Sequence, residues 1–212
     1  RLAIELSFVC TLRRGELLAL TWDDINWEQN SLQISKTLCR VSKDALLMLE
    51  ERDVLHVFPT DAHSRTVLVL KLPKTESSNR IVYLPPSLKC SLLEWQNEQK
   101  KSAIGELPRL IFAYEDDRPL QGGVLTKHFQ GLLTKCNLPK VTFHSLRHSS
   151  ITYKLVLTGG DIKAVQGDSG HSQADMITEI YGHILDANRR KNTERFEEAF
   201  YQNCGTISCN RT

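Results

Sequence analysis

Apolar residues recur at intervals of three and four along much of this chain, a pattern typical of amphipathic helices. From Leu125 to Cys136 they fall on one helical face. Residues 1–20 indicate two helical segments that meet near Gly15, because glycine weakens a helix interior. Further helices are expected over 87–103, 143–157, a short segment capped by Asp161, a segment from 172 through 181, and 186–201. The pattern therefore predicts a mainly helical protein.

Strand-like alternation is confined to the first 85 residues. Leu32 and Ile34 alternate with polar neighbours in 31–36, and the apolar runs 67–70 and 81–84 resemble two further strands. Residues 73–79 have the composition of a turn, which would place Lys74 between the last two strands. We expect an α+β fold with one small antiparallel sheet. Residues 38–65 are interpreted as an insertion in the first hairpin, with a helix-compatible piece over 44–52 and no readable role.

Length and composition suit a single domain over residues 1–212. The chain has 212 residues, of which 41% are hydrophobic and 25% charged, enough to bury a sizeable core. It contains no run of about 20 apolar residues, as a membrane span requires. Its first residues do not follow the basic, apolar and cleavage-site order of a signal peptide. Its six scattered cysteines fit reduced thiols. We expect a soluble, intracellular domain, cut from a longer chain.

Charge is distributed unevenly, although the net charge is only +2. Between residues 118 and 160 there is no Asp or Glu, where the average composition predicts about five, and there are six Lys or Arg. A block of one sign suits a phosphate backbone. An ordinary solvated basic face explains the same block equally well.

Three short clusters carry candidate chemistry, and one of them is Gly170-His171 followed ten residues later by Tyr181. His144 and Arg147 are three residues apart, so one helix can direct both at a small target. Arginine matches two phosphate oxygens, and histidine moves a proton near neutral pH. Arg13 and Glu16 have the same spacing, which lets the carboxylate orient the guanidinium. Taken alone, the first pair is equally explained by ordinary polar residues on a surface helix, and the second by a surface ion pair. His144 and His148 have the spacing of zinc ligands, but no nearby Cys or Glu completes such a site.

The order of the clusters is more specific than any one of them. The chain runs Leu-Arg-Arg-Gly-Glu-Leu, Pro-Lys-Thr, His-Ser-Leu-Arg-His, Ser-Gly-His-Ser and Ile-Tyr-Gly-His. This ordered set resembles the tyrosine recombinase (phage integrase) family over nearly the whole chain, with the nearest likeness to integrases of conjugative transposons and temperate phages. The resemblance implies the mainly helical catalytic fold of that family, and DNA cleavage and rejoining through a 3′-phosphotyrosyl intermediate, without metal, ATP or other cofactor.

The resemblance also implies a role for individual residues. The catalytic set would be Arg13, Lys74, His144, Arg147, His171 and the nucleophile Tyr181, with Glu16 supporting Arg13. Arg80 and Lys140 are further candidates for DNA contacts. Of the five tyrosines, only Tyr181 lies a short distance after Gly-His; the others are explained by packing. The chain departs from the family in having Thr11 where relatives usually have glycine, so the backbone there is expected to differ locally.

The implied partner is double-stranded DNA, on which relatives assemble as tetramers with accessory DNA-bending or directionality proteins. The resemblance further implies a cytoplasmic, nucleoid-associated bacterial protein, and relatives usually carry separate N-terminal DNA-binding domains. The isolated domain is therefore expected to be monomeric and to hold DNA weakly. Residues 186–212 are a candidate segment for docking on a neighbouring copy. Two alternatives remain: DNA relaxation by a type IB topoisomerase, which uses a similar site, and a non-catalytic DNA-binding module of the same fold. The complete motif set argues against the second.

Overall fold

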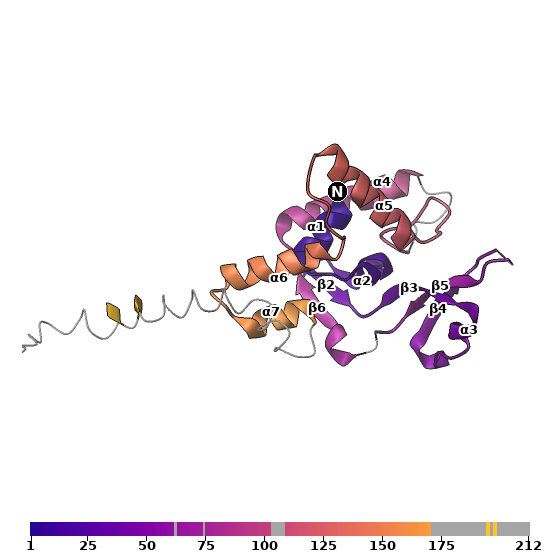
Figure 1. Ribbon diagram of the computed structural model, residues 1–212, viewed down its shortest axis with the longest axis horizontal. Helices are drawn as coiled ribbons and strands as arrows, with labels where there is room; N and C mark the ends of the chain where they lie inside the picture. Colours follow the sequence, from indigo (N-terminus) through magenta and orange to yellow (C-terminus); the bar gives the residue numbers. More distant parts are fainter. Residues whose placement is uncertain (62, 74, 103–108, 171–193, 196, 199–212) are drawn as a thin grey trace, which may run out of the picture.

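Helices surround a small central sheet, and a second sheet projects to one side (Figure 1). The computed structural model describes residues 1–212 except 62, 74, 103–108, 171–193, 196 and 199–212. The expected α+β class is confirmed. Among the described residues, no helix combines the length and apolar content needed to cross a bilayer.

The chain begins with two short helices, α1 (Leu2–Val9) and α2 (Arg14–Ala19). The expected break near Gly15 was wrong by a few residues, because the helices part at 10–13 and Gly15 lies in the first turn of α2. Gly15 is needed for a different reason. A Cβ there would lie 2.5 Å from Thr37 Oγ1 and 3.0 Å from the Leu38 carbonyl oxygen, so only glycine lets α2 approach the strand at Thr37–Ser42 this closely.

The strands form two separate antiparallel sheets, in contrast to the single sheet expected. In the central sheet, β2 (Ser31–Ile34) lies between β1 (Ile25–Asn26) and β6 (Arg80–Tyr83), with Leu32 opposite Val82. Leu32 and Ile34 are both buried, as their alternation predicted. The turn at 73–79 therefore does not close a hairpin: β6 pairs with β2, and the strand before the turn pairs elsewhere.

The second sheet accounts for most of the segment whose role was unreadable. Its order is β3 (Thr37–Ser42), β5 (Thr66–Lys71) and β4 (Val54–Phe58). The helix expected over 44–52 is reduced to α3 (Lys43–Leu46) and a 3₁₀ turn at Glu51–Asp53. Leu47 and Met48 are 84% and 87% exposed. A longer helix here would therefore have no neighbouring surface against which to bury its apolar residues.

The helical pattern of the second half is confirmed where it is described. The helices are α4 (Pro86–Ser102), α5 (Gly122–Lys135), α6 (Ser145–Leu157) and α7 (Ile162–Ser169). Asp161 caps α7 by accepting a hydrogen bond from the Ala164 amide at 2.9 Å. The helix expected over 172–181 lies outside the described residues, as does that over 186–201 apart from 194–195 and 197–198.

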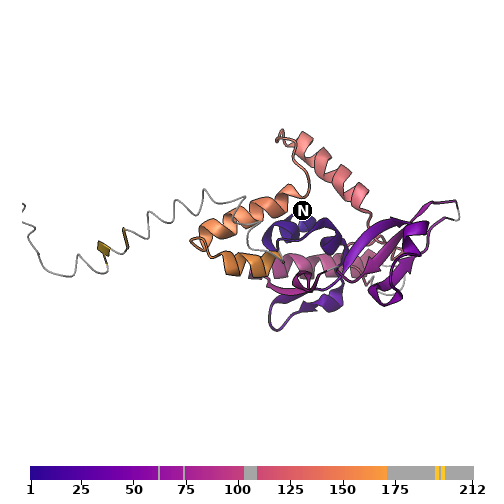
Figure 2. The same ribbon diagram turned by 60° about the horizontal axis from the view of Figure 1, so that its bottom comes forward.

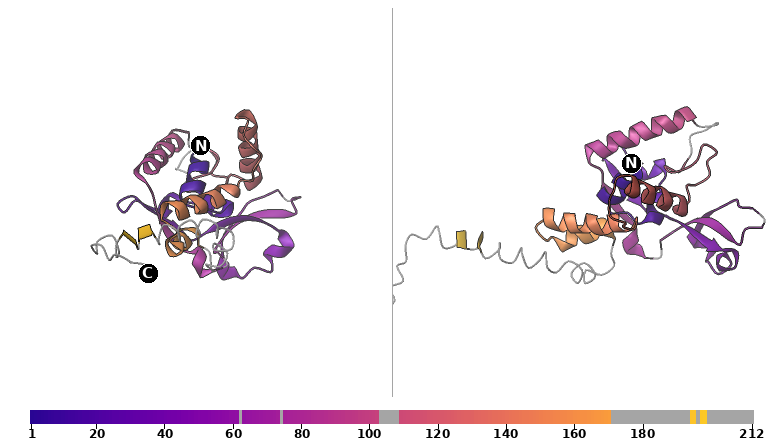
Figure 3. Two further views of the ribbon diagram at one scale, coloured as in Figure 1. Left: turned by 60° about the vertical axis from the view of Figure 1, so that its left-hand side comes forward. Right: turned by 45° about the horizontal axis from the view of Figure 1, so that its top comes forward.

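One main core holds the first half of the chain against α4 and α5. Leu6, Leu17, Leu32, Leu92 and Ile111 are completely buried in it. A smaller cluster of Ile151, Leu155 and Val165 joins α6 to α7, and these two helices lie together on the side of the molecule away from the second sheet (Figures 1 and 2). Seen from other sides, α4 and α5 stand apart from this pair (Figure 3). The N-terminal end of α2, β6 and the end of α7 meet between these parts.

Candidate active site

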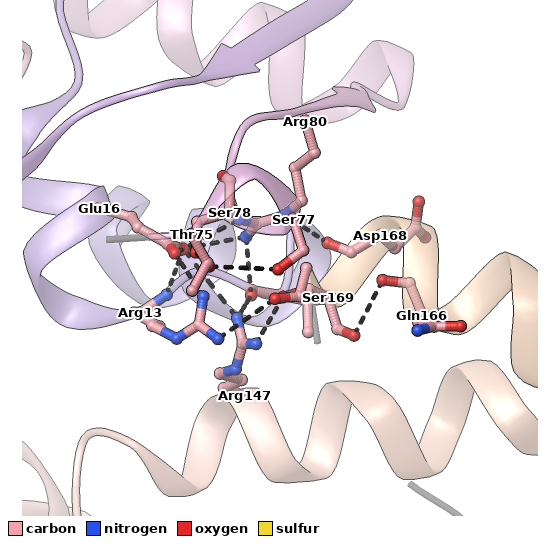
Figure 4. A network of polar contacts seen from close by, with 12 residues as sticks. Arg13, Glu16, Thr75, Ser77, Ser78, Arg80, Arg147, Gln166, Asp168 and Ser169 are labelled. Atoms are coloured by element: carbon pink, nitrogen blue, oxygen red, sulfur yellow. Dashed lines mark hydrogen bonds and ion pairs between the residues drawn. The ribbon is translucent and has the colours of Figure 1, made fainter. Parts of the chain in front are cut away.

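A buried carboxylate, Glu16, is the centre of the polar network in which the candidate residues meet (Figure 4). Its Oε2 accepts a hydrogen bond from the Arg13 amide at 2.9 Å, which caps α2. Its Oε1 accepts one from Arg13 Nη1 at 2.7 Å. Arg13 and Glu16 thus meet as their spacing predicted, and the Arg13 side chain stays 37% exposed.

Glu16 is held in its charged form by its arginine neighbours. Burial alone would raise the pKa of this carboxyl, but hydrogen bonds and charge from Arg80, joined by hydrogen bonds from Arg13, hold the pKa below its ordinary value. Arg80 Nη2 lies 2.9 Å from Glu16 Oε2, and both side chains are only 5% exposed. The ion pair and its hydrogen bonds offset the desolvation cost that an isolated buried charge would incur uncompensated.

Arg147, on α6, is 2% exposed and lies against the same centre. Its Nη1 donates to the Thr11 carbonyl oxygen and its Nη2 to the Ser169 carbonyl oxygen. Nη1 also lies 4.0 Å from Glu16 Oε2. Arg13 Nη2 donates to the Gly170 carbonyl oxygen at 3.4 Å. Two guanidinium groups from distant parts of the chain therefore converge on consecutive carbonyls at the end of α7.

Thr11 occupies the position where a glycine was expected, and its backbone keeps the conformation that favours glycine. Its φ is +54°, which for a β-branched residue costs on the order of 1–3 kcal/mol. The strained residue is fully buried, and its hydroxyl shares a hydrogen bond of 2.8 Å with the Ser150 hydroxyl on α6. In this conformation the Thr11 carbonyl oxygen accepts the hydrogen bond from Arg147 Nη1. Thr11 thus has a left-handed backbone, which glycine adopts more readily, and its hydroxyl is paired with that of Ser150.

Gly170 ends α7 in the left-handed conformation, with φ +64°. A Cβ at this position would lie 2.7 Å from the Ser77 carbonyl oxygen and 3.0 Å from Arg80 Nη1. The glycine of the Gly-His step is thus required both by its backbone angle and by the close approach of the 73–79 turn. It brings the end of α7 directly against that turn.

His144 lies just before α6, at its N-cap position. Burial lowers the pKa of His144 below its ordinary value of 6.5, and His148, Arg147 and Arg13 lower it further by charge repulsion. The rings of His144 and His148 meet edge to face, with centroids 4.8 Å apart. His144 is thus predominantly neutral at pH 7 and able to accept a proton.

The other sequence candidates have different outcomes. Lys74, His171 and Tyr181 lie outside the described residues. Lys140 is exposed in the loop between α5 and α6. Arg80, a candidate for DNA contact, is buried, and its guanidinium donates to protein acceptors (Figure 4). This arrangement argues for a supporting role. The alternation of the strand carried a sequence signal for this burial. Arg80 and Val82 are the two inward positions of β6, and an inward arginine needs a buried acid.

The sequence matches the profile described as the phage integrase family over residues 1–188. Among curated relatives, a "Tyrosine recombinase XerC-like" protein of Caldanaerobacter subterraneus subsp. tengcongensis is 26% identical over 92% of this chain and 48% of its own length. The "Integrase" of Staphylococcus phage L54a is 24% identical, with 94% and 52% covered. The "ICEBs1 integrase" of Bacillus subtilis is 22% identical, with 91% and 47% covered. The chain thus spans about half the length of these relatives.

Solved structures of recombinases share the fold of this chain. The Tn1549 transposon integrase in complex with circular intermediate DNA superposes with a TM-score of 0.70 at 23% identity, over 92% of this chain and 59% of that one. The XerH site-specific recombinase bound to its difH substrate gives 0.60 at 20% identity, over 93% and 46%. With the profile match over most of the sequence, these findings confirm the resemblance that the motifs indicated, and the chain belongs to the phage integrase family.

Proposed function

We propose that this chain is the catalytic part of a site-specific recombinase that cleaves and rejoins DNA through a covalent bond between a 3′ phosphate and Tyr181. The observation that supports this most directly is the convergence of Arg13 and Arg147 on the end of α7. The relatives are about twice as long as this chain. The activity, the DNA substrate and the partners are therefore part of the proposal.

Two converging guanidinium groups suit the chemistry of a phosphodiester. Attack on phosphorus concentrates negative charge on the non-bridging oxygens, and fixed donors aimed at those oxygens lower the barrier. Arginine offers a planar fork that matches two phosphate oxygens. Arg13 is oriented by Glu16 and partly exposed, so it is accessible to a phosphate. Arg147 is buried, and we infer that the protein groups that shield its guanidinium move aside when the phosphate enters.

The reaction also needs two proton transfers. Tyrosine has an ordinary pKa of about 10, so its hydroxyl must lose a proton as it attacks. His144, neutral at pH 7, is the proposed acceptor. The new bond joins Tyr181 Oη to phosphorus, while the bond from phosphorus to the 5′ oxygen breaks. Lys74 is proposed to protonate that leaving oxygen, and His171 to hold a phosphate oxygen. Because the phosphate ester is retained, a second 5′-hydroxyl can reverse the step.

The biological setting is proposed from the relatives. Their names include an integrase of a phage, the ICEBs1 integrase and, among structures, a transposon integrase with circular intermediate DNA. We therefore propose integration or excision of a mobile element, by four copies on two DNA sites with accessory proteins, in the bacterial cytoplasm. Residues 186–212 are proposed to dock on a neighbouring copy. Unchanged assembly of paired sites after their deletion would refute that docking role.

The test uses the complete gene product that contains this chain and a nicked duplex carrying its site. The site is found by denaturing the reaction with a random duplex library and sequencing the DNA that stays attached to protein. The wild type should form an adduct that survives denaturation, and Tyr181→Phe should form none. Tyr153→Phe is the matched control, because Tyr153 is a surface tyrosine, 60% exposed, that packs against Phe8.

The product separates recombination from relaxation. A recombinase should exchange strands between two DNA molecules that carry the site, whereas a topoisomerase should relax supercoiled DNA without exchange. An adduct that persists in Tyr181→Phe would refute the assignment of the nucleophile. Absence of any adduct from the wild type on the selected DNA would refute the proposed activity.

A further inference from the structure

Arg80 is a buried arginine that no catalytic role described above uses. It occupies an inward position of β6, in register with Ile34 of β2, and the whole residue is 8% exposed. An arginine rarely occurs so deep in a fold unless its charge is paired and its donors are satisfied. Its contacts therefore indicate what the fold gains from it.

All five N–H donors of the Arg80 guanidinium have acceptors. Nε donates to the Asp168 carbonyl oxygen at 2.8 Å. Nη1 donates to Glu16 Oε1 at 3.3 Å and to the Ser78 carbonyl oxygen at 3.2 Å. Nη2 donates to Glu16 Oε2 at 2.9 Å and to the Thr11 carbonyl oxygen at 3.4 Å. One side chain thus joins four separate segments of the chain (Figure 4).

Each of the four segments leads to a different part of the candidate site. Glu16 orients Arg13, and the Thr11 carbonyl also accepts from Arg147. Ser78 ends the short turn that follows Lys74, and Asp168 lies at the end of α7 just before the Gly-His step. A displacement of Arg80 would therefore move both catalytic arginines relative to each other and loosen the turn from α7.

We propose that Arg80 is a positioning residue for DNA cleavage, which fixes the two phosphate-binding arginines relative to each other and to the segments bearing Lys74 and His171. The inference rests on the proposed function. Arg80 does not touch the DNA; it acts through Glu16 and through the Thr11, Ser78 and Asp168 carbonyls. Neutralising the charge of Glu16 is not its whole role, because three of its five bonds go to backbone carbonyls.

Arg80→Lys is the informative variant, because it keeps the positive charge but presents one ammonium in place of a planar fork. A lysine can remain paired with Glu16, yet it cannot hold four segments at their present angles. Misplacement of a catalytic group by about 1 Å can slow a reaction about 100-fold. We therefore expect Arg80→Lys to fold and bind DNA like the wild type, and to form the covalent adduct about 10- to 100-fold more slowly.

The experiment measures single-turnover adduct formation on two forms of the selected duplex, one with the natural scissile phosphate and one with a methylphosphonate there. The methyl group replaces a charged non-bridging oxygen, so cleavage depends less on well-placed arginines. If Arg80 positions Arg13 and Arg147, the defect of Arg80→Lys should be at least several-fold smaller on the methylphosphonate. Melting temperature and DNA affinity are measured for the same preparations. Arg40→Lys is the matched control, because Arg40 is an exposed strand arginine whose guanidinium donates a hydrogen bond to Thr66.

The outcomes separate this inference from the proposed function. Wild-type cleavage rates in a folded Arg80→Lys would overturn it, and so would an equal defect on both substrates. Loss of cooperative melting or of DNA binding in this variant would show that Arg80 only stabilises the fold, and would also overturn it. Failure of the wild type to form any adduct would instead contradict the proposed function.

Discussion

Replacing Glu16 with glutamine tests whether the buried carboxylate stabilises the site as its contacts indicate. Each carboxylate oxygen accepts two hydrogen bonds: Oε1 from the Nη1 atoms of Arg13 and Arg80, and Oε2 from the Arg13 amide and Arg80 Nη2. Glutamine keeps one accepting oxygen and turns an amide donor toward two other donors. The change therefore removes two hydrogen bonds, at least one of them to a charged group, and leaves Arg80 buried with weaker compensation.

The expected loss follows from those contacts. A hydrogen bond to a charged group contributes about 1.5–3 kcal/mol, and breaking a buried ion pair costs about 3–5 kcal/mol. We expect Glu16→Gln to lower the free energy of unfolding by about 3 kcal/mol. For a domain of this size that corresponds to a fall in melting temperature of about 6–12 °C. Urea denaturation at pH 7, followed by tryptophan fluorescence, measures the first quantity directly.

The pH dependence gives a second measure of the same interaction. The folded-state pKa of Glu16 lies below its ordinary value of 4.5, so its contribution to stability is present above pH 4.5 and is lost as the pH falls through the folded-state pKa. Glu16→Gln should remove this part of the acid destabilisation. Glu98→Gln is the control: Glu98 pairs with Lys101 at 2.7 Å but is 62% exposed, and exposed pairs contribute about 0–1 kcal/mol. A loss for Glu16→Gln no larger than that of the control would refute the reasoning.

Three further predictions concern the backbone and the proton acceptor. Gly170→Ala should slow adduct formation at least tenfold and lower the melting temperature, because its Cβ would meet the 73–79 turn at 2.7 Å. Thr11→Ala should cost about 1–3 kcal/mol of unfolding free energy by urea denaturation, since it leaves the buried Ser150 hydroxyl without its partner. The cleavage rate should fall as the pH drops through the His144 pKa, below 6.5, and His148→Gln should move this fall to higher pH because it removes a repelling charge.

A matched glycine control and three contradicting outcomes test these predictions. Gly131→Ala, in the middle of α5 with nothing within 4 Å of the added Cβ, should leave cleavage unchanged and stabilise the chain slightly. A Gly170→Ala variant as active as Gly131→Ala would contradict the close-approach argument. Thr11→Ala with wild-type stability would mean that the hydroxyl pair is not needed to hold the strained backbone. A pH–rate profile that His148→Gln does not shift would exclude His144 as the titrating group.

Periodic patterns predicted the helices well, because a helix leaves its signature within a few residues. The apolar spacing in α5, the proline start of α4 and the Asp161 cap are local signals, and each gave an element close to its observed bounds. Strand pairing depends on distant residues. The runs 67–70 and 81–84 were recognised as strands, but their partners are β3 with β4, and β2 respectively, which no local pattern specifies.

The candidate site shows the same division. Ordered motifs identified Arg13, Glu16, His144 and Arg147, and the spacing of Arg13 and Glu16 predicted their contact. The contacts of Arg80 could not be predicted in this way, because three of its acceptor residues, Thr11, Glu16 and Asp168, lie far from it in sequence. Thr11 was noticed as a missing glycine, but its left-handed backbone and its bond to Ser150 depend on the packing of α6.

The central claim is that Tyr181 forms a covalent bond to DNA. Its most direct test is mass spectrometry of the denatured adduct after digestion with protease and nuclease. The account predicts one modified peptide, in which the Tyr181 oxygen carries a nucleotide through its 3′ phosphate, and none from the Tyr181→Phe protein. A nucleotide attached to another residue, or through a 5′ phosphate, would contradict the account.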